Sequence, residues 1–95
     1  MENIQTLQTL YSKYHNGEIE ECKYNGKIVY CGGLNAYDAG TEVYDKEGNL
    51  IGHCGFLWGK TEDAICKELK ECEVIYRVKN NIWGLPFVDK YGLSK

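Results

Sequence analysis

The chain has 95 residues, enough for one domain and too few for two, since compact domains cluster near roughly 100 to 150 residues. Hydrophobic residues make up 43% of the sequence and charged residues 26%, which argues against a disordered or collagen-like chain. The formal net charge of -3 argues against a broad basic surface for nucleic acid, and no run approaches the roughly 20 apolar residues that span a bilayer.

The first predicted element is an amphipathic helix over residues 3–15. Its apolar residues recur at spacings of three and four and so share one helical face. They are Ile4, Leu7, Leu10, Tyr11 and Tyr14. Asn3 is the expected N-cap, and the helix should end near Asn16-Gly17, because glycine adopts the left-handed C-terminal conformation without steric strain.

Two β-hairpins are predicted next. Asn25-Gly26 is the dipeptide most favoured in a two-residue hairpin turn, and it separates the strands of the first hairpin. A polar turn over residues 46–49 separates the strands of the second. The four predicted strands are residues 18–24, 27–31, 41–45 and 50–58.

The positions of glycines predict where these strands end or become irregular. Gly32 and Gly33 break the pattern of the second strand, so residues 34–40 are expected to form a loop. Gly52 and Gly55 lie inside the last hairpin strand, where glycine indicates a bulge or a close approach of another segment.

A short helix and one further strand complete the predicted elements. Thr61 can cap the helix, and residues 73–79 alternate as a strand with one buried face does. Asn80-Asn81 can turn the chain, after which Pro86 prevents regular continuation.

The predicted fold class is therefore α+β. It comprises an N-terminal helix, about five mostly antiparallel strands in hairpins, and one short helix before the last main strand. Neither a repeat nor a linker divides the sequence, so we expect a single domain over residues 1–95, with a β-rich body over 18–83 and an irregular C-terminal tail over 84–95.

Five cysteines allow at most two intramolecular disulfides and leave one thiol over. The candidates are Cys22, Cys31, Cys54, Cys66 and Cys72. Cys54 precedes the loop to the short helix, so its expected partner is Cys66 or Cys72. A fully reduced set is the alternative, because free cysteine often packs as a small buried hydrophobe.

The cysteine content also bears on location. Small exported domains use disulfides where their cores are limited, so we expect an exported protein of the periplasm or cell surface whose signal peptide has been removed. The first residues carry no basic region and no apolar run, so a complete cytoplasmic protein is the alternative.

Several segments together carry a family resemblance. They are Tyr24-Asn25-Gly26-Lys27-Ile28-Val29-Tyr30, Tyr37-Asp38, the residues from Val43 to Ile51, Cys54-Gly55, and Asp63 with Cys66. Over about residues 18–83 the chain resembles a small uncharacterised domain of exported proteins and lipoproteins of Bacteroidetes. The family's cysteine pair is Ala36-Tyr37 here, so no disulfide pattern is carried over. The resemblance implies export and a shared fold, without a known activity.

No catalytic, cofactor-binding or metal-binding residue is predicted. A zinc site needs four well-spaced ligands, and no Cys-x-x-Cys occurs. A catalytic cysteine needs a nearby histidine, and neither His15 nor His53 stands in a motif with one. Asp45, Glu47 and Asn49 resemble a calcium loop in composition but not in spacing, so a hairpin turn is preferred.

Aromatic and apolar residues in loops and in the tail are the remaining functional signal, because Trp and Tyr are enriched at protein interfaces. The candidate partner contacts are Tyr37, Trp58, Trp83, Leu85, Phe87 and Tyr91. A second small core under the tail is the competing interpretation.

The leading hypothesis is a non-enzymatic, exported, disulfide-stabilised binding module for an unknown protein, inhibitor-like in one form, and a monomer or weak homodimer. One alternative is a small cytoplasmic protein of phage or mobile-element type that blocks a host factor. A second alternative is a thiol-dependent enzyme.

Overall fold

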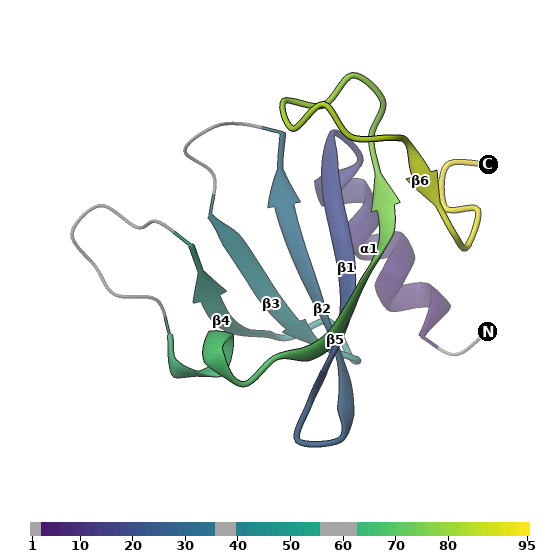
Figure 1. Ribbon diagram of the computed structural model, residues 1–95. Coiled ribbons are helices and arrows are strands. Elements are labelled where there is room, and N and C mark those ends of the chain that lie inside the picture. The colour runs from purple at the N-terminus through teal and green to yellow at the C-terminus, as the bar shows by residue number, and fades with distance from the viewer. Residues whose placement is uncertain (1–2, 36–39, 56–62) are drawn as a thin grey trace.

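An antiparallel sheet with one helix across one face makes up most of the computed structural model, which describes residues 3–35, 40–55 and 63–95 (Figure 1). The elements in chain order are α1 (Ile4–Tyr14), β1 (Gly17–Tyr24), β2 (Lys27–Leu34), β3 (Thr41–Asp45), β4 (Leu50–Cys54), the 3₁₀ helix η1 (Ala64–Lys67), β5 (Lys70–Arg77) and β6 (Val88–Asp89). The predicted α+β class is confirmed, with six strands in these ranges instead of about five.

The strands follow the order β4-β3-β2-β1-β5-β6, and every neighbouring pair is antiparallel. β1 and β2 form the predicted hairpin, and both turn residues, Asn25 and Gly26, have the positive φ that a type I′ turn requires. β5 then returns from η1 to the free edge of β1 (Figure 1). Within the described ranges, no helix has both the length and the apolar character needed to cross a bilayer.

The main core lies between α1 and the sheet. Leu7, Leu10 and Tyr14 are buried, as their helical spacing predicts. They pack with Ile19, Tyr30, Tyr44, Ile75 and Tyr76 from the strands. Asn3 lies at the predicted N-cap but makes no side-chain cap; its amide donates to the Tyr30 hydroxyl at 3.2 Å instead, which ties the start of the helix to β2.

A second core covers the opposite face of the sheet. Its buried members are Cys22, Val29, Cys31 and Val43, with Tyr24, Cys54, Ile65 and Leu69 packed against them. The close approach predicted at Gly52 is present, because a Cβ there would stand 2.6 Å from Ile65 Cγ2. Within residues 63–69, the side chains of Ile65 and Leu69 therefore cover this face. Thr61, the predicted cap, lies outside the described residues.

The predicted break at Gly32 and Gly33 is wrong. β2 continues through both residues to Leu34 and pairs with β1 and β3. A Cβ on Gly32 would stand 2.3 Å from Cε2 of Tyr14, so glycine is present there because the tyrosine ring lies directly on the strand. Gly32, which was expected to end the strand, instead allows the helix to contact the sheet.

The C-terminal tail is ordered on the sheet instead of irregular throughout. Val88 and Asp89 pair with the end of β5, and Tyr91 and Leu93 pack against the main core. The Asp89 carboxylate accepts backbone hydrogen bonds from Leu93 at 2.7 Å and Ser94 at 3.0 Å, which fold the last residues into a turn. Residues 78–87, between β5 and β6, consequently form a loop anchored at both ends.

Candidate functional site

Three of the predicted partner contacts lie together in the loop of residues 78–87. Trp83, Leu85 and Phe87 are 39%, 47% and 43% exposed, large fractions for residues of this size and polarity. Tyr91 lies instead against the core, and its hydroxyl donates to Glu21 at 3.1 Å. Tyr37 and Trp58, the other two predicted contacts, fall outside the described residues.

Asn81 fixes the backbone of this loop from within. Its side chain is buried, and its amide donates to the carbonyls of Val78 at 2.8 Å and Leu85 at 2.9 Å. Its side-chain oxygen accepts the Leu85 amide at 3.0 Å. One side chain thus closes a ring of hydrogen bonds across five residues, none of which involves the Trp83 side chain.

The loop is also bound to the sheet on both sides. The amide of Ile82 donates to the side-chain oxygen of Asn35 at 2.7 Å, just after β2. On the other side Arg77 Nη1 donates to the Pro86 carbonyl at 3.4 Å, and the same Arg77 side chain pairs with Glu18 of β1 at 2.6 Å. Sequence reasoning assigned only a turn to Asn81 and no role to Asn35, because their partners become visible only once β1, β2 and β5 are side by side.

The aromatic side chains of the loop are not equally constrained. The Phe87 ring packs edge-on against Tyr76 with the centroids 6.3 Å apart, and the Lys79 ammonium lies 5.3 Å from the Phe87 centroid. Phe87 therefore supports the base of the loop. Trp83 and Leu85, two residues apart, are the exposed apolar side chains nearest its tip.

A second group of polar side chains converges between α1 and β3. One carboxylate oxygen of Glu42 accepts hydrogen bonds from Lys13 at 2.8 Å, from the Tyr14 hydroxyl at 2.6 Å and from the Tyr44 hydroxyl at 3.2 Å. The two hydroxyls are 2.8 Å apart. Sequence reasoning placed Tyr14 on the apolar face of the helix and Tyr44 only within a strand. It missed this network, which requires side chains of the helix to reach β3.

The electrostatics of this network are those of a structural clamp. The hydrogen bond from Lys13, followed by that from Tyr14, holds the pKa of Glu42 below its usual range. Burial, with Glu42 as hydrogen-bond acceptor, raises the pKa of Tyr14. A general base working near neutrality needs the opposite shift in a carboxylate, so the arrangement favours a fixed ion pair over proton transfer.

An open pocket of about 230 Å³ lies beside the clamp. Its lining includes Tyr14, Thr41, Glu42 and His53, and the His53 ring nitrogen Nδ1 is 3.8 Å from the second Glu42 oxygen. Gly32, Leu34 and Gly40 also line it. The pocket is smaller than a typical small-molecule site, and one oxygen of its main polar group, Glu42, already accepts three hydrogen bonds from the protein.

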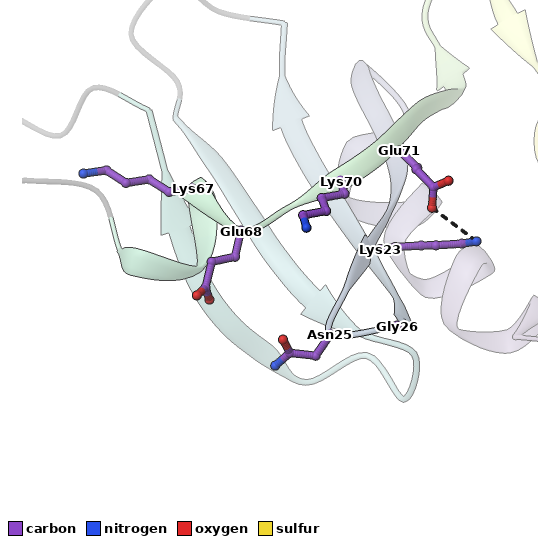
Figure 2. A pocket seen from close by; sticks show the side chains of 7 residues that line it. All are labelled: Lys23, Asn25, Gly26, Lys67, Glu68, Lys70 and Glu71. Atoms are coloured by element: carbon purple, nitrogen blue, oxygen red, sulfur yellow. Dashed lines mark ion pairs between the residues drawn. The ribbon is translucent and has the colours of Figure 1, made fainter.

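A larger hollow of about 340 Å³ lies between the β1–β2 turn and the segment of residues 67–71 (Figure 2). It is lined by Lys23, Asn25, Gly26, Lys67, Glu68, Lys70 and Glu71. Lys23 and Glu71 point toward one another as an exposed ion pair of 3.3 Å, whereas Lys67 and Glu68 point outward (Figure 2). Ligand sites are mostly apolar with few polar groups, so this mixed-charge hollow indicates a solvated surface.

The cysteines form two disulfides, Cys22–Cys72 and Cys54–Cys66. Cys66 is one of the two partners that the sequence suggested for Cys54. Cys31 is free and buried, and burial raises its thiol pKa to about 12. A nucleophilic thiol needs the opposite environment, exposed and electropositive, so Cys31 does not support the thiol-dependent enzyme.

Comparison with known proteins finds no matching family, no similar characterised protein and no similar solved structure. The resemblance to the exported Bacteroidetes domain therefore stays a prediction.

Proposed function

We propose that this chain is a binding module that docks on a partner protein through residues 81–87. The observation that carries the proposal is that large apolar side chains are exposed on a backbone held by a buried asparagine. Folding ordinarily buries such side chains, and this loop is ordered without burying Trp83 or Leu85.

This combination suits protein recognition. Binding energy at interfaces is concentrated in a few residues, with Trp enriched among them. A loop already fixed in its bound conformation loses little entropy on binding, so more of the contact energy appears as affinity. We infer a partner surface with an apolar groove for Trp83 and Leu85, bordered by a carboxylate that faces the Lys79 ammonium beside Phe87. Insertion of the loop into an enzyme cleft would be the inhibitor-like form.

Two disulfides are typical of proteins in oxidising compartments, so the setting that we propose for this interaction is the periplasm or the cell surface. The resemblance to exported domains agrees with that setting. The intact mass of protein from its native compartment tests it directly. Mass spectrometry after alkylation under denaturing conditions should find one alkylated cysteine; five alkylated cysteines would overturn the export proposal.

The docking proposal has a matched control within the chain. Leu85 and Leu50 are 47% and 48% exposed, but Leu50 lies on the edge strand β4, away from the loop. A photo-crosslinker on the immobilised chain should capture the partner, whose affinity is then measured for wild type, Trp83→Ala, Leu85→Ala and Leu50→Ala. We expect a loss of about 30-fold for each loop variant, as for interface hot spots, and less than about twofold for Leu50→Ala.

Three outcomes would overturn the proposal. One is an equal loss for Leu50→Ala and Leu85→Ala, and another is failure to capture any protein whose binding depends on Leu85. The third is self-association that Leu85→Ala abolishes, measured by sedimentation, because the occupant of the surface would then be a second copy of this chain.

A further inference from the structure

Two further sulfurs and one carboxylate lie close to the Cys22 sulfur, which is on the face of the sheet opposite α1. Cys22 lies on β1, bonded to Cys72 of β5, and its sulfur is 3.9 Å from the free thiol of Cys31 on β2. One carboxylate oxygen of Glu20 and the sulfurs of Cys22 and Cys72 all lie within 4.8 Å of one another. Glu20 is also the β1 residue directly paired with Cys31.

The separation of the Cys22 and Cys31 sulfurs matches one edge of a tetrahedral thiolate site. Zinc–sulfur bonds of about 2.3 Å imply a separation of about 3.8 Å between two sulfurs of one tetrahedron. Cys22 and Cys31 already stand at that separation without being bonded to each other. Two buried cysteines on adjacent strands therefore provide one edge of the tetrahedron, with no movement of β1 or β2.

Cys72 lies where the pairing of β5 with β1 is irregular. Between the pairs Glu21 with Glu73 and Lys23 with Lys70, two β5 residues stand opposite Cys22 alone, which is a β-bulge. Cys72 is one of those two residues and is exposed. Breaking its bond to Cys22 would let its sulfur withdraw to the spacing of a shared metal ion while the ladder on either side stays paired.

We propose that reduction of the Cys22–Cys72 disulfide converts this cluster into a zinc site with Cys22, Cys31, Cys72 and Glu20 as ligands. A dithiol reductant supplies two electrons and two protons, becomes a disulfide itself and leaves Cys22 and Cys72 as thiols. Zn²⁺ then displaces the protons of the three thiols, and the Glu20 carboxylate completes four-coordination. Soft thiolates with one oxygen donor in a tetrahedral arrangement suit zinc and not magnesium or calcium.

The consequence is that β1 and β5 would be joined in either redox state. In an oxidising compartment the disulfide makes the link, and in a reducing one the metal replaces it. Structural zinc can supply folding energy in this way because its ligands assemble only in the folded chain. The proposal is independent of the docking loop, which lies at the other end of β5.

The second disulfide supplies a matched control. Cys54 and Cys66 also become two thiols on reduction, so zinc binding by any reduced cysteine pair would be seen there too. The variant Cys54→Ser with Cys66→Ser removes that pair and leaves the proposed site intact. Cys31→Ala removes a ligand that takes no part in either disulfide, so the oxidised variant can be checked for wild-type folding before reduction.

The full chain is reduced with a phosphine, freed of reductant and titrated with Zn²⁺ against a chromophoric chelator, and with Co²⁺ to observe tetrahedral thiolate absorption bands. We expect one zinc per reduced wild-type or Cys54→Ser/Cys66→Ser chain and none for the oxidised protein. Loss of an outer-shell group typically weakens metal binding 10- to 100-fold, so Cys31→Ala should weaken it by more than about 100-fold, and Glu20→Gln by at least about 10-fold.

Each contrary result refutes the assignment. Reduced wild type that binds no zinc, or Cys31→Ala that binds as tightly as wild type, would show that the cluster is not a metal site. Zinc binding lost with Cys54→Ser/Cys66→Ser would place the metal at the other cysteine pair.

Discussion

Gly32→Ala tests the contact between helix and sheet most directly. The new Cβ would stand 2.3 Å from Cε2 of Tyr14 and 2.6 Å from two further ring carbons, whereas carbon atoms in contact are about 3.5 to 4.0 Å apart. The ring or the strand must therefore move by more than about 1 Å. The Tyr14 hydroxyl is held by Glu42 at 2.6 Å and by Tyr44 at 2.8 Å, so the ring cannot swing aside without breaking these hydrogen bonds.

The magnitude follows from these two effects. Overpacking a core typically destabilises by about 1–3 kcal/mol, and each lost hydrogen bond adds about 0.5–1.5 kcal/mol. We expect Gly32→Ala to lower the free energy of unfolding by about 3 kcal/mol, which in a domain of this size lowers Tm by roughly 12–20 °C. Urea denaturation of the oxidised protein, followed by circular dichroism, measures the difference.

The neighbouring glycine is the control. A Cβ on Gly33 would meet its nearest atom, Thr41 Oγ1, at 3.7 Å, an ordinary contact. Since alanine is favoured over glycine inside a strand by about 0.5–1 kcal/mol, Gly33→Ala should be neutral or slightly stabilising. Stabilities of the two variants within about 0.5 kcal/mol of each other, the margin within which independent mutational effects usually add, would refute the contact of Tyr14 with β2.

Three further predictions concern charge, the loop and the free thiol. Because Lys13 holds the pKa of Glu42 below its usual value of about 4.3, Glu42 stabilises the fold above that pH and loses this contribution as the pH falls through its lower folded pKa. Glu42→Gln should therefore reduce the fall of Tm with decreasing pH on the acid side. A pH dependence of Tm equal to that of wild type would contradict the stabilising role of the hydrogen bonds from Lys13 and Tyr14 to Glu42. Asn81→Ala should speed hydrogen exchange at the Leu85 amide and lower the free energy of unfolding by about 1–3 kcal/mol. Asn81→Asp should be intermediate, because it keeps the acceptor for that amide. Equal exchange in wild type and both variants would argue against the hydrogen bonds that Asn81 makes within the loop. Because the Cys31 thiol is buried, iodoacetamide should leave it unmodified in the folded oxidised protein and alkylate it in urea. Peptide mass spectrometry can detect the alkylation. Rapid labelling of the native chain would place the thiol at the surface.

Local patterns carried much of the fold. The apolar spacing from Ile4 to Tyr14 predicted α1 and its buried face, and Asn25-Gly26 predicted the first hairpin. Both signals depend only on residues close together in sequence, because a helical face and a two-residue turn are set by the backbone of a few neighbours. The candidate contacts Trp83, Leu85 and Phe87 were chosen from residue type and position; the structure shows that they are exposed, and their role in docking stays a proposal.

The remaining features of the fold depend on contacts between residues that are far apart in the sequence. Gly32 was misinterpreted because the ring that explains it belongs to α1, eighteen positions earlier in the chain. The tail was expected to be irregular because nothing near Val88 shows that the end of β5 has a free edge to pair with. The choice of Cys22 for Cys72 depends on β5 returning beside β1, across a sequence separation of 50 residues. Such pairings depend on which surfaces meet once the core is packed. Residues throughout the chain determine this, so the residues next to a paired segment do not reveal its partner.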